Sequence, residues 1–254
     1  MYPILGFIND TPILSYYVFN SIGIIAGFIV LFLSMKNFDP SKRNRTLLFA
    51  ALIFIPFILG ARLGNMLEDF LFHTPECVTK NILIGPSSIW WGLAVSNLCA
   101  IPIARALKVN LWETGDLFAL CIAMGGIFAR FACLLNGCCF GTPAPADFPF
   151  AVYYPYGSYA YSIFGGAPVY PAQLFESVAW FFIFMALFLR NRAKAFHGEL
   201  IILLGFLYAI ARFIIEFFRY HEKPGFPSSA QVLSLIILAA SALVWILKKR
   251  GVIR

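Results

Sequence analysis

Charged side chains are scarce in this sequence. Only 12% of its 254 residues are Asp, Glu, Lys or Arg, whereas 61% are hydrophobic, and the mean hydropathy is +0.81. A soluble domain carries about 25% charged residues, so this chain has too little polar surface to face water. Apolar runs near the ~20 residues that cross a bilayer recur along its length. The composition excludes a soluble globular core and predicts a polytopic membrane protein.

The beginning of the sequence also lacks a basic region. Asp10 is the single charged residue between Met1 and Thr11, so we expect no cleavable signal peptide. The net charge of +7 is compatible with nucleic-acid binding by itself. However, the basic residues form short clusters between apolar runs, which is typical of membrane topology. We therefore predict no nucleic-acid partner.

The apolar runs predict an all-α bundle of about seven transmembrane helices in a single integral membrane domain, residues 1–254. The predicted spans are residues 13–34, 47–60, 88–103, 117–135, 171–189, 200–218 and 230–247. The second and third spans are short. We expect them to extend toward Arg62 and Ile82, where polar side chains would face protein or water.

The distribution of Lys and Arg predicts the orientation. With the N-terminus outside, 13 of the 19 basic residues fall on the inner side, and residues 137–170 contain none. The positive-inside rule therefore predicts an N-out, C-in topology. Residues 137–170 are rich in Gly, Pro and Tyr, and disordered segments are poor in aromatic residues. We read this stretch as non-helical and expect an ordered extracytoplasmic cap segment between the fourth and fifth spans.

Four arginines of the predicted outer side lie within or against apolar runs: Arg62, Arg130, Arg212 and Arg219. An arginine at the centre of a membrane helix costs about 2.5–3.5 kcal/mol. A single such residue can extend its side chain to the lipid headgroups. Four at one membrane face indicate a shared anion site.

The end of the sixth predicted span has the strongest charge pattern. Arg212, Glu216 and Arg219 are spaced i, i+4, i+7, so we expect them on one helix face, with Glu216 paired to either arginine. The free side of a guanidinium can bind phosphate bidentately. A purely structural ion pair is the alternative. Glu176, near the start of the fifth span, also needs a partner such as one of the arginines.

Two of the six cysteines fall within predicted spans, where a thiol packs as a small apolar group. The other four lie on the predicted outer side, at Cys77, Cys133, Cys138 and Cys139. Positive charge from Arg130 favours a thiolate at the adjacent pair. A nucleophile, a redox pair, a metal-linked or haem-linked site, a disulfide to Cys77 and simple packing all remain open. Because the spacing matches no established zinc pattern, we predict no metal.

Five short motifs occur in order along residues 12–247. They are Gly60-Ala-Arg62-Leu-Gly64, Arg130 with Asn136 and Gly141, Tyr170-Pro171-Ala-Gln173-Leu-Phe175-Glu176, Arg212-Phe-Ile-Ile-Glu216-Phe-Phe-Arg219 and Ser229-Ala-Gln231-Val-Leu-Ser234. This ordered set resembles the bacterial prolipoprotein diacylglyceryl transferase family. The predicted seven-span, N-out topology agrees with that family.

The resemblance implies an enzyme of the bacterial plasma membrane that needs no cofactor. Such enzymes move a diacylglyceryl group from phosphatidylglycerol to the thiol of a lipobox cysteine in a prolipoprotein, at the outer face. Arg130, Arg212 and Glu216 would be catalytic, because charge develops on the departing phosphate. The expected substrate-binding residues are Arg62, Asn136, Gly141, Gln173, Glu176, Arg219 and Gln231.

The sequence departs from the family at functional positions. The family carries a His-Gly-Gly motif in its third span, where this chain has Trp90-Trp91-Gly92. Cys133 and Cys138 stand where the family has asparagine and glutamate. A candidate base and a candidate acid are therefore missing.

These departures leave other functions open. His73 or His221 could replace the family histidine only if the outer loops fold inward. Alternatively, the chain is a divergent paralogue that acts on a different thiol or lipid acceptor. A non-enzymatic phospholipid-binding membrane protein is the third possibility.

Overall fold

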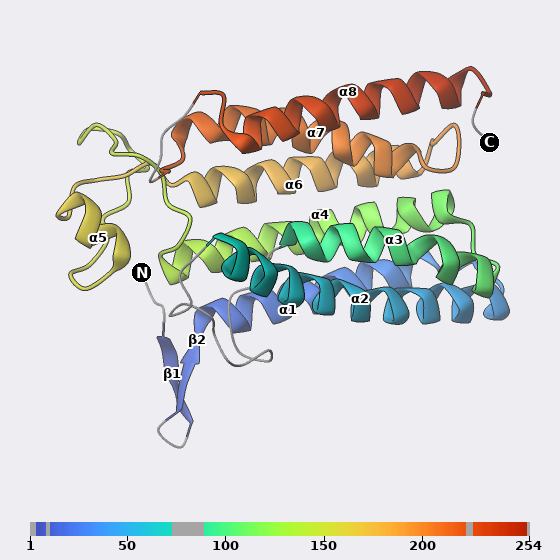
Figure 1. Cartoon of the computed structure of the whole chain (residues 1–254), viewed down its shortest axis with the longest axis horizontal. Helices are drawn as coiled ribbons and strands as arrows, with labels where there is room; N and C mark the ends of the chain where they lie inside the picture. Colours follow the sequence, from blue (N-terminus) through green and yellow to red (C-terminus); the bar gives the residue numbers. More distant parts are fainter. Residues whose placement is uncertain (1–3, 9–10, 73–88, 222–225, 253–254) are drawn as a thin grey trace. The chain divides into compact units, whose positions relative to one another are not determined.

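The computed structural model describes residues 4–8, 11–72, 89–221 and 226–252 (Figure 1). The elements are β1 (Ile4–Ile8), β2 (Thr11–Leu14), α1 (Ser15–Ser34), α2 (Pro40–Phe72), α3 (Ile89–Leu107), α4 (Leu111–Asn136), α5 (Tyr159–Phe164), α6 (Ala172–Asn191), α7 (Glu199–Ile215), the 3-10 helix η2 (Glu216–Phe218) and α8 (Ser229–Lys249). Helices therefore make up most of the described chain.

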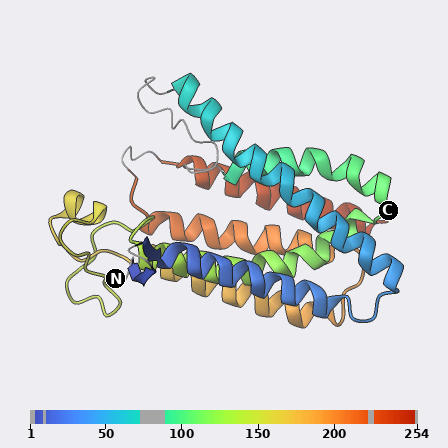
Figure 2. The same cartoon turned by 90° about the horizontal axis from the view of Figure 1, so that it is seen from below.

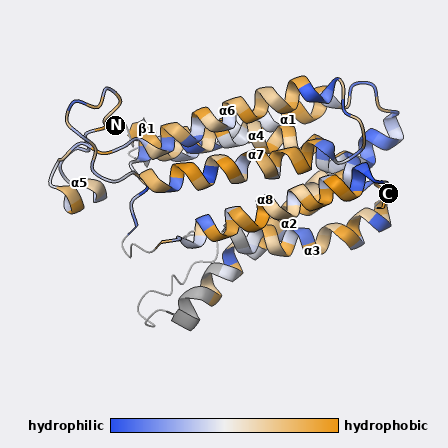
Figure 3. Ribbon diagram, turned by 90° about the horizontal axis from the view of Figure 1, so that it is seen from above, coloured by the Kyte–Doolittle hydropathy of each residue, from blue (hydrophilic) through white to orange (hydrophobic). Residues whose placement is uncertain are grey.

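Six of the described helices are long and apolar enough to cross a membrane: α1, α2, α4, α6, α7 continued through η2, and α8. A shorter apolar stretch, Trp91–Leu107, forms most of α3. Figure 3 shows hydrophobic residues along these helices and hydrophilic residues near their ends. These seven helices match the seven predicted spans. The prediction of a polytopic all-α membrane protein is confirmed.

The second span is the one whose length was most wrong. It was predicted over residues 47–60, but α2 runs from Pro40 to Phe72 and includes Arg62. Apolar periodicity marks only the lipid-compatible part of a helix, whereas backbone hydrogen bonding continues into polar sequence. The expected extension of the third span toward Ile82 lies outside the described residues.

The described chain forms two compact units, one of residues 1–34 with 115–254 and the other of residues 35–114. In the second unit α2 packs against α3. Glycines make this approach close, since a Cβ at Gly64 would lie 2.0 Å from the Trp91 ring and one at Gly60 would lie 2.6 Å from Val95 Cβ. The glycines of the first motif therefore have a packing role. A single integral domain remains a prediction.

In the first unit α6 packs against α7, and α7 packs against α8 (Figures 1 and 2). The core between α4, α6 and α7 consists of Ala119, Leu120, Ala123, Trp180, Ile183, Leu187, Leu200 and Leu204. The rings of Trp180 and Tyr208 stack with centroids 4.5 Å apart. Gly126 leaves room for the Trp180 ring, because a Cβ there would lie 2.5 Å from it.

A buried carboxylate fixes the turn between α6 and α7. Asp116, 1% exposed, accepts hydrogen bonds from the backbone N–H groups of Gly198 (3.0 Å) and Leu200 (2.8 Å). Its Oδ2 also lies 3.1 Å from Lys194 Nζ. A carboxylate at a helix N-terminus satisfies free donors and favours the helix dipole. Asp116 on α4 thereby fixes where α7 begins.

Residues 137–170 are folded, and the expectation of a wholly non-helical stretch is wrong at α5. The Ser158 side chain caps α5 by accepting from the Tyr161 N–H, and Gly165 ends it in the left-handed conformation. The Phe140 ring packs at the centre of this segment against Tyr154, Phe164 and Tyr220, among other rings. Its position outside the membrane remains a prediction.

A β-hairpin that the sequence analysis did not predict precedes α1. Strands β1 and β2 pair antiparallel, with Phe7 opposite Pro12 and Ile8 opposite Thr11. The pairing shifts register between Ile4 and Gly6. Ile4, Leu5 and Phe7 are exposed, so apolar burial does not mark this segment in the sequence.

Candidate functional site

Three arginines converge on the carboxylate of Glu176, which is 2% exposed on α6. Arg130 Nε lies 3.1 Å from Glu176 Oε2, Arg219 Nη1 lies 3.4 Å from the same oxygen, and Arg212 Nη1 lies 3.5 Å from Oε1. These side chains come from α4, from the end of η2 and from α7. The prediction that Glu176 pairs with one of the arginines is confirmed, and three of them share it.

Glu216 is the second buried carboxylate of this cluster. Its Oε2 lies 2.8 Å from Arg212 Nη2, and its Oε1 lies 3.0 Å from His221 Nε2. The Ser228 hydroxyl donates to Oε1 at 2.7 Å. Glu216 thus connects the end of α7 to the residue that caps α8.

The predicted single face of Arg212, Glu216 and Arg219 is only partly right. The α-helix ends at Ile215, η2 tightens the backbone, and Arg219 is extended with φ −87° and ψ 144°. The i, i+4 pair with Arg212 survives this change, but the i+7 position leaves the helical face. The described ion pair of Arg219 is therefore with Glu176.

The three guanidiniums offer more hydrogen-bond donors than the two carboxylates use. Each guanidinium has five N–H donors, and the side chains of Arg130, Arg212 and Arg219 are only 25%, 13% and 14% exposed. Arg219 Nε is shielded from solvent and has no hydrogen-bond acceptor among the described residues. A buried donor without an acceptor is costly. The cluster is therefore suited to an anionic oxygen ligand.

Two cavities border the cluster. One of about 410 Å³ is lined by residues that include Glu216, Arg219, Ser228 and His221. The larger, about 810 Å³, is lined by Asn136, Gly137, Cys138, Cys139, Phe140, Pro155, Tyr156, Gly157, Ser158, Tyr159, Tyr220 and His221. The His221 side chain belongs to both linings, so the condition for it to serve in place of the family histidine is met. His73 lies outside the described residues.

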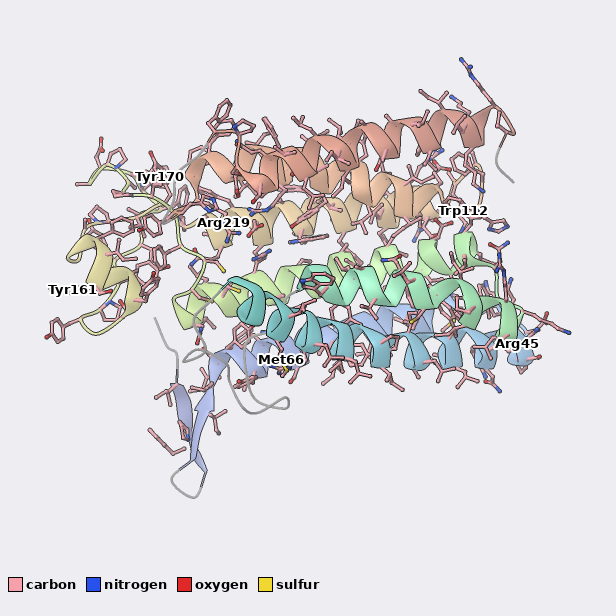
Figure 4. All side chains as sticks on the ribbon, viewed as in Figure 1. Arg45, Met66, Trp112, Tyr161, Tyr170 and Arg219 are labelled. Atoms are coloured by element: carbon pink, nitrogen blue, oxygen red, sulfur yellow. The ribbon has the colours of Figure 1, made fainter. Side chains whose placement is uncertain are left out.

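The backbone binds the folded segment to this cluster. Gly141 N–H donates to the Tyr170 carbonyl at 3.1 Å, and Gly141 bridges to Arg219. A Cβ at Gly141 would lie 2.4 Å from the Tyr170 oxygen and 2.6 Å from the Phe218 oxygen. Figure 4 shows Arg219 and Tyr170 at the same end of this unit. Only glycine fits between these two carbonyl groups.

Cys133, Cys138 and Cys139 also meet here, with all three sulfur atoms within 4.8 Å of one another. Gly137, at φ 77°, ends α4, and the Cys138 N–H donates back to the Cys133 carbonyl at 3.2 Å. Hydrogen bonds from the Cys133 and Cys138 thiols and the charges of Arg219 and Arg130 lower the pKa of Cys139. The described cysteines are all free, and the suggested partner Cys77 lies outside the described residues.

The model of the family described as prolipoprotein diacylglyceryl transferase matches residues 3–247. The chain belongs to the prolipoprotein diacylglyceryl transferase family. It is 26% identical over 253 residues to phosphatidylglycerol–prolipoprotein diacylglyceryl transferase 2 of Clostridium perfringens, covering 97% of this chain and 95% of the relative.

Two further relatives carry the name phosphatidylglycerol–prolipoprotein diacylglyceryl transferase. The Campylobacter curvus protein is 34% identical over 217 residues, 79% of this chain and 76% of the relative. The Campylobacter lari protein is 36% identical over 203 residues, 72% and 69% of the two chains. The family recognised from the motifs is confirmed.

The remaining residues expected to bind substrate in this transferase family have structural partners here. Gln173 is fully buried and donates to the Cys138 carbonyl (2.7 Å) and to the Tyr154 hydroxyl (2.9 Å). Gln231 forms a capping box with Ser228 at the start of α8. Substrate contacts by these residues remain predictions, as they do for Asn136 and Gly141. Arg62 lies in the other unit and is not placed relative to the cluster.

The sequence analysis missed Ser228 and the grouping of the three thiols. Ser228 was detectable, because Ser followed three residues later by Gln before an apolar run is the capping-box pattern. The thiols were not detectable from spacing alone, since the turn at Gly137 brings them together.

Proposed function

We propose that this transferase moves a diacylglyceryl group from phosphatidylglycerol to the cysteine thiol of a prolipoprotein. The observation that carries the proposal is the convergence of Arg130, Arg212 and Arg219 on Glu176. Family membership and the names of the relatives support the substrates. We place the reaction at the outer face of the bacterial plasma membrane, following the predicted topology.

The chemistry requires a cationic site for a phosphodiester. The acceptor sulfur attacks the glyceryl carbon that bears the phosphate, and the carbon–oxygen bond breaks. The phosphate then leaves as glycerol phosphate and gains negative charge. Guanidiniums fixed beforehand at the phosphate oxygens stabilise that charge as it develops. Glu176 and Glu216 keep the arginines in place, so the site needs little reorganisation.

We assign the acid–base role to His221. Its Nε2 pairs with Glu216 Oε1, and the side chain lines both cavities. A carboxylate beside an imidazole orients it and stabilises its protonated form. His221 would accept the proton of the acceptor thiol, the task left open by Trp90-Trp91-Gly92 in the third span.

A transfer assay in proteoliposomes tests the function. The vesicles contain phosphatidylglycerol labelled in the diacylglyceryl part, and the acceptor is a lipobox peptide. We expect thioether-linked label on the peptide. Arg130→Lys keeps the charge but loses the bidentate donor geometry, and we expect transfer to fall about 10²-fold.

Arg192→Lys is the matched control. Arg192 lies at the opposite end of α6, over the Phe188 ring, and this change should leave transfer intact. Wild-type protein that binds phosphatidylglycerol through Arg130 but labels no peptide would reject the transferase. That result would instead favour a binding protein or a paralogue with another acceptor.

A further inference from the structure

The three-thiol cluster has a geometry that suits one metal ion. The sulfur atoms of Cys133, Cys138 and Cys139 lie within 4.8 Å of one another. Three sulfurs bound to one zinc ion at about 2.3 Å lie about 3.8 Å apart in a tetrahedral arrangement. Small side-chain rotations therefore suffice to bring the thiols to coordination distance.

The local backbone is built to hold the thiols together. Gly137 reverses the chain after α4, and the Cys138 N–H donates to the Cys133 carbonyl. Cys139 adopts φ 60°, a conformation that side-chain-bearing residues rarely adopt. Gln173, fully buried, holds the Cys138 carbonyl from the other side. A strained, doubly anchored cysteine pair points to a function beyond packing.

We propose that Cys133, Cys138 and Cys139 bind a zinc ion that receives the acceptor thiol in its fourth coordination position. Three protein ligands and one open position are the arrangement of catalytic zinc sites. Cys138 and Cys139 line the cavity of about 810 Å³, so an ion held by them borders the space that an acceptor would enter. The identity of the acceptor rests on the proposed function.

The step is balanced as follows. The acceptor thiol binds zinc and gives its proton to His221, which lines the same cavity. The zinc-bound thiolate attacks the glyceryl carbon, the carbon–sulfur bond forms, and the carbon–oxygen bond to phosphate breaks. The glycerol phosphate that leaves takes up the proton from His221. No oxidant or reductant is needed, because zinc does not change its oxidation state.

The role of zinc would be to supply a thiolate at neutral pH, since a metal-bound thiol is deprotonated. Zinc with three thiolates carries one negative charge. Arg130 and Arg219 act electrostatically on Cys139 and can balance this charge. The cysteines found in place of the family asparagine and glutamate thereby gain a joint function.

Metal content of the purified full-length protein is the first test. We expect one zinc ion per chain in the wild type and its loss in Cys133→Ser and Cys138→Ser. Cys121→Ser is the matched control, because Cys121 lies on α4 and its thiol donates to the Leu117 carbonyl away from the cluster. Cys139→His replaces one ligand by another and should retain zinc, which separates loss of a ligand from loss of the fold.

Cobalt(II) in place of zinc makes the fourth position visible. We expect thiolate-to-cobalt absorption bands that shift when a lipobox peptide is added. The same peptide with serine in place of its cysteine should cause no shift. A spectrum unchanged by the cysteine peptide would overturn the assignment of the acceptor to the metal.

The outcomes separate this inference from the proposed function. A metal-free wild type that still transfers lipid, or one with copper or a disulfide at these cysteines, would overturn the zinc site and leave the transferase standing. Stoichiometric zinc and a peptide-dependent cobalt spectrum without any lipid transfer would support the metal site and reject the transferase.

Discussion

The Nε atom of Arg130 lies 3.1 Å from Oε2 of Glu176, so a guanidinium on α4 meets a carboxylate on α6 inside the helix bundle. Arg212 and Arg219 reach the same carboxylate from α7 and from the end of η2. One acidic side chain therefore holds together the basic residues of three elements. Its removal would leave largely buried positive charges facing one another.

We predict that Glu176→Gln lowers the free energy of unfolding by about 3 kcal/mol, because it removes one partner of a buried ion cluster. The measurement is unfolding of the purified protein in detergent micelles. Glu113→Gln serves as the control. Glu113 pairs with Lys42 at 2.7 Å, but the Lys42 side chain is 44% exposed, so this change should cost about 1 kcal/mol or less. Equal losses in the two variants would contradict the prediction.

His221→Gln should slow lipid transfer about 10²-fold, because it removes the group to which we assign proton transfer. The amide keeps a donor that can reach Glu216, so the fold and the binding of phosphatidylglycerol should change little. Initial rates in proteoliposomes measure the effect. His197→Gln, at an exposed site in the turn before α7, is the control. Unchanged rates in His221→Gln would remove this histidine from the mechanism.

Gly141→Ala should destabilise the protein by about 1–3 kcal/mol, because a Cβ would meet the carbonyl oxygens of Tyr170 and Phe218 at 2.4 and 2.6 Å. Transfer should fall as well, since the backbone at Gly141 bridges to Arg219. Gly6→Ala is the matched control, because nothing lies within 4 Å of a Cβ there. A normal melting curve for Gly141→Ala would show that the segment can shift without cost.

Burial raises the pKa of Tyr154 to about 12, from an ordinary value of about 10. The folded-state pKa lies above the unfolded value, so the neutral phenol favours folding below pH ~10. That contribution is lost as the pH rises from ~10 toward ~12. Ultraviolet titration should show a late tyrosinate step that Tyr154→Phe abolishes. Tyr156→Phe, which alters an exposed ring, should leave the late step in place, and its loss in both variants would refute the assignment.

The sequence by itself determined the membrane character, the number of apolar helices and the family. Runs of apolar residues near 20 in length can be satisfied only by helices in lipid, so composition and length suffice. The pairing of Arg212 with Glu216 was also readable, because i, i+4 spacing is a property of any α-helix. The family motifs lie in order along one chain and need no coordinates.

Only the tertiary structure decided which residues meet. Glu176 and Arg130 are far apart in sequence, and nothing local predicts that α4 and α6 bring them within 3.1 Å. The departure of Arg219 from the helical face depends on where α7 tightens into η2. The grouping of Cys133 with Cys138 and Cys139 depends on the left-handed turn at Gly137. Helix periodicity determines neighbours within an element, but contacts between elements depend on packing of the whole unit.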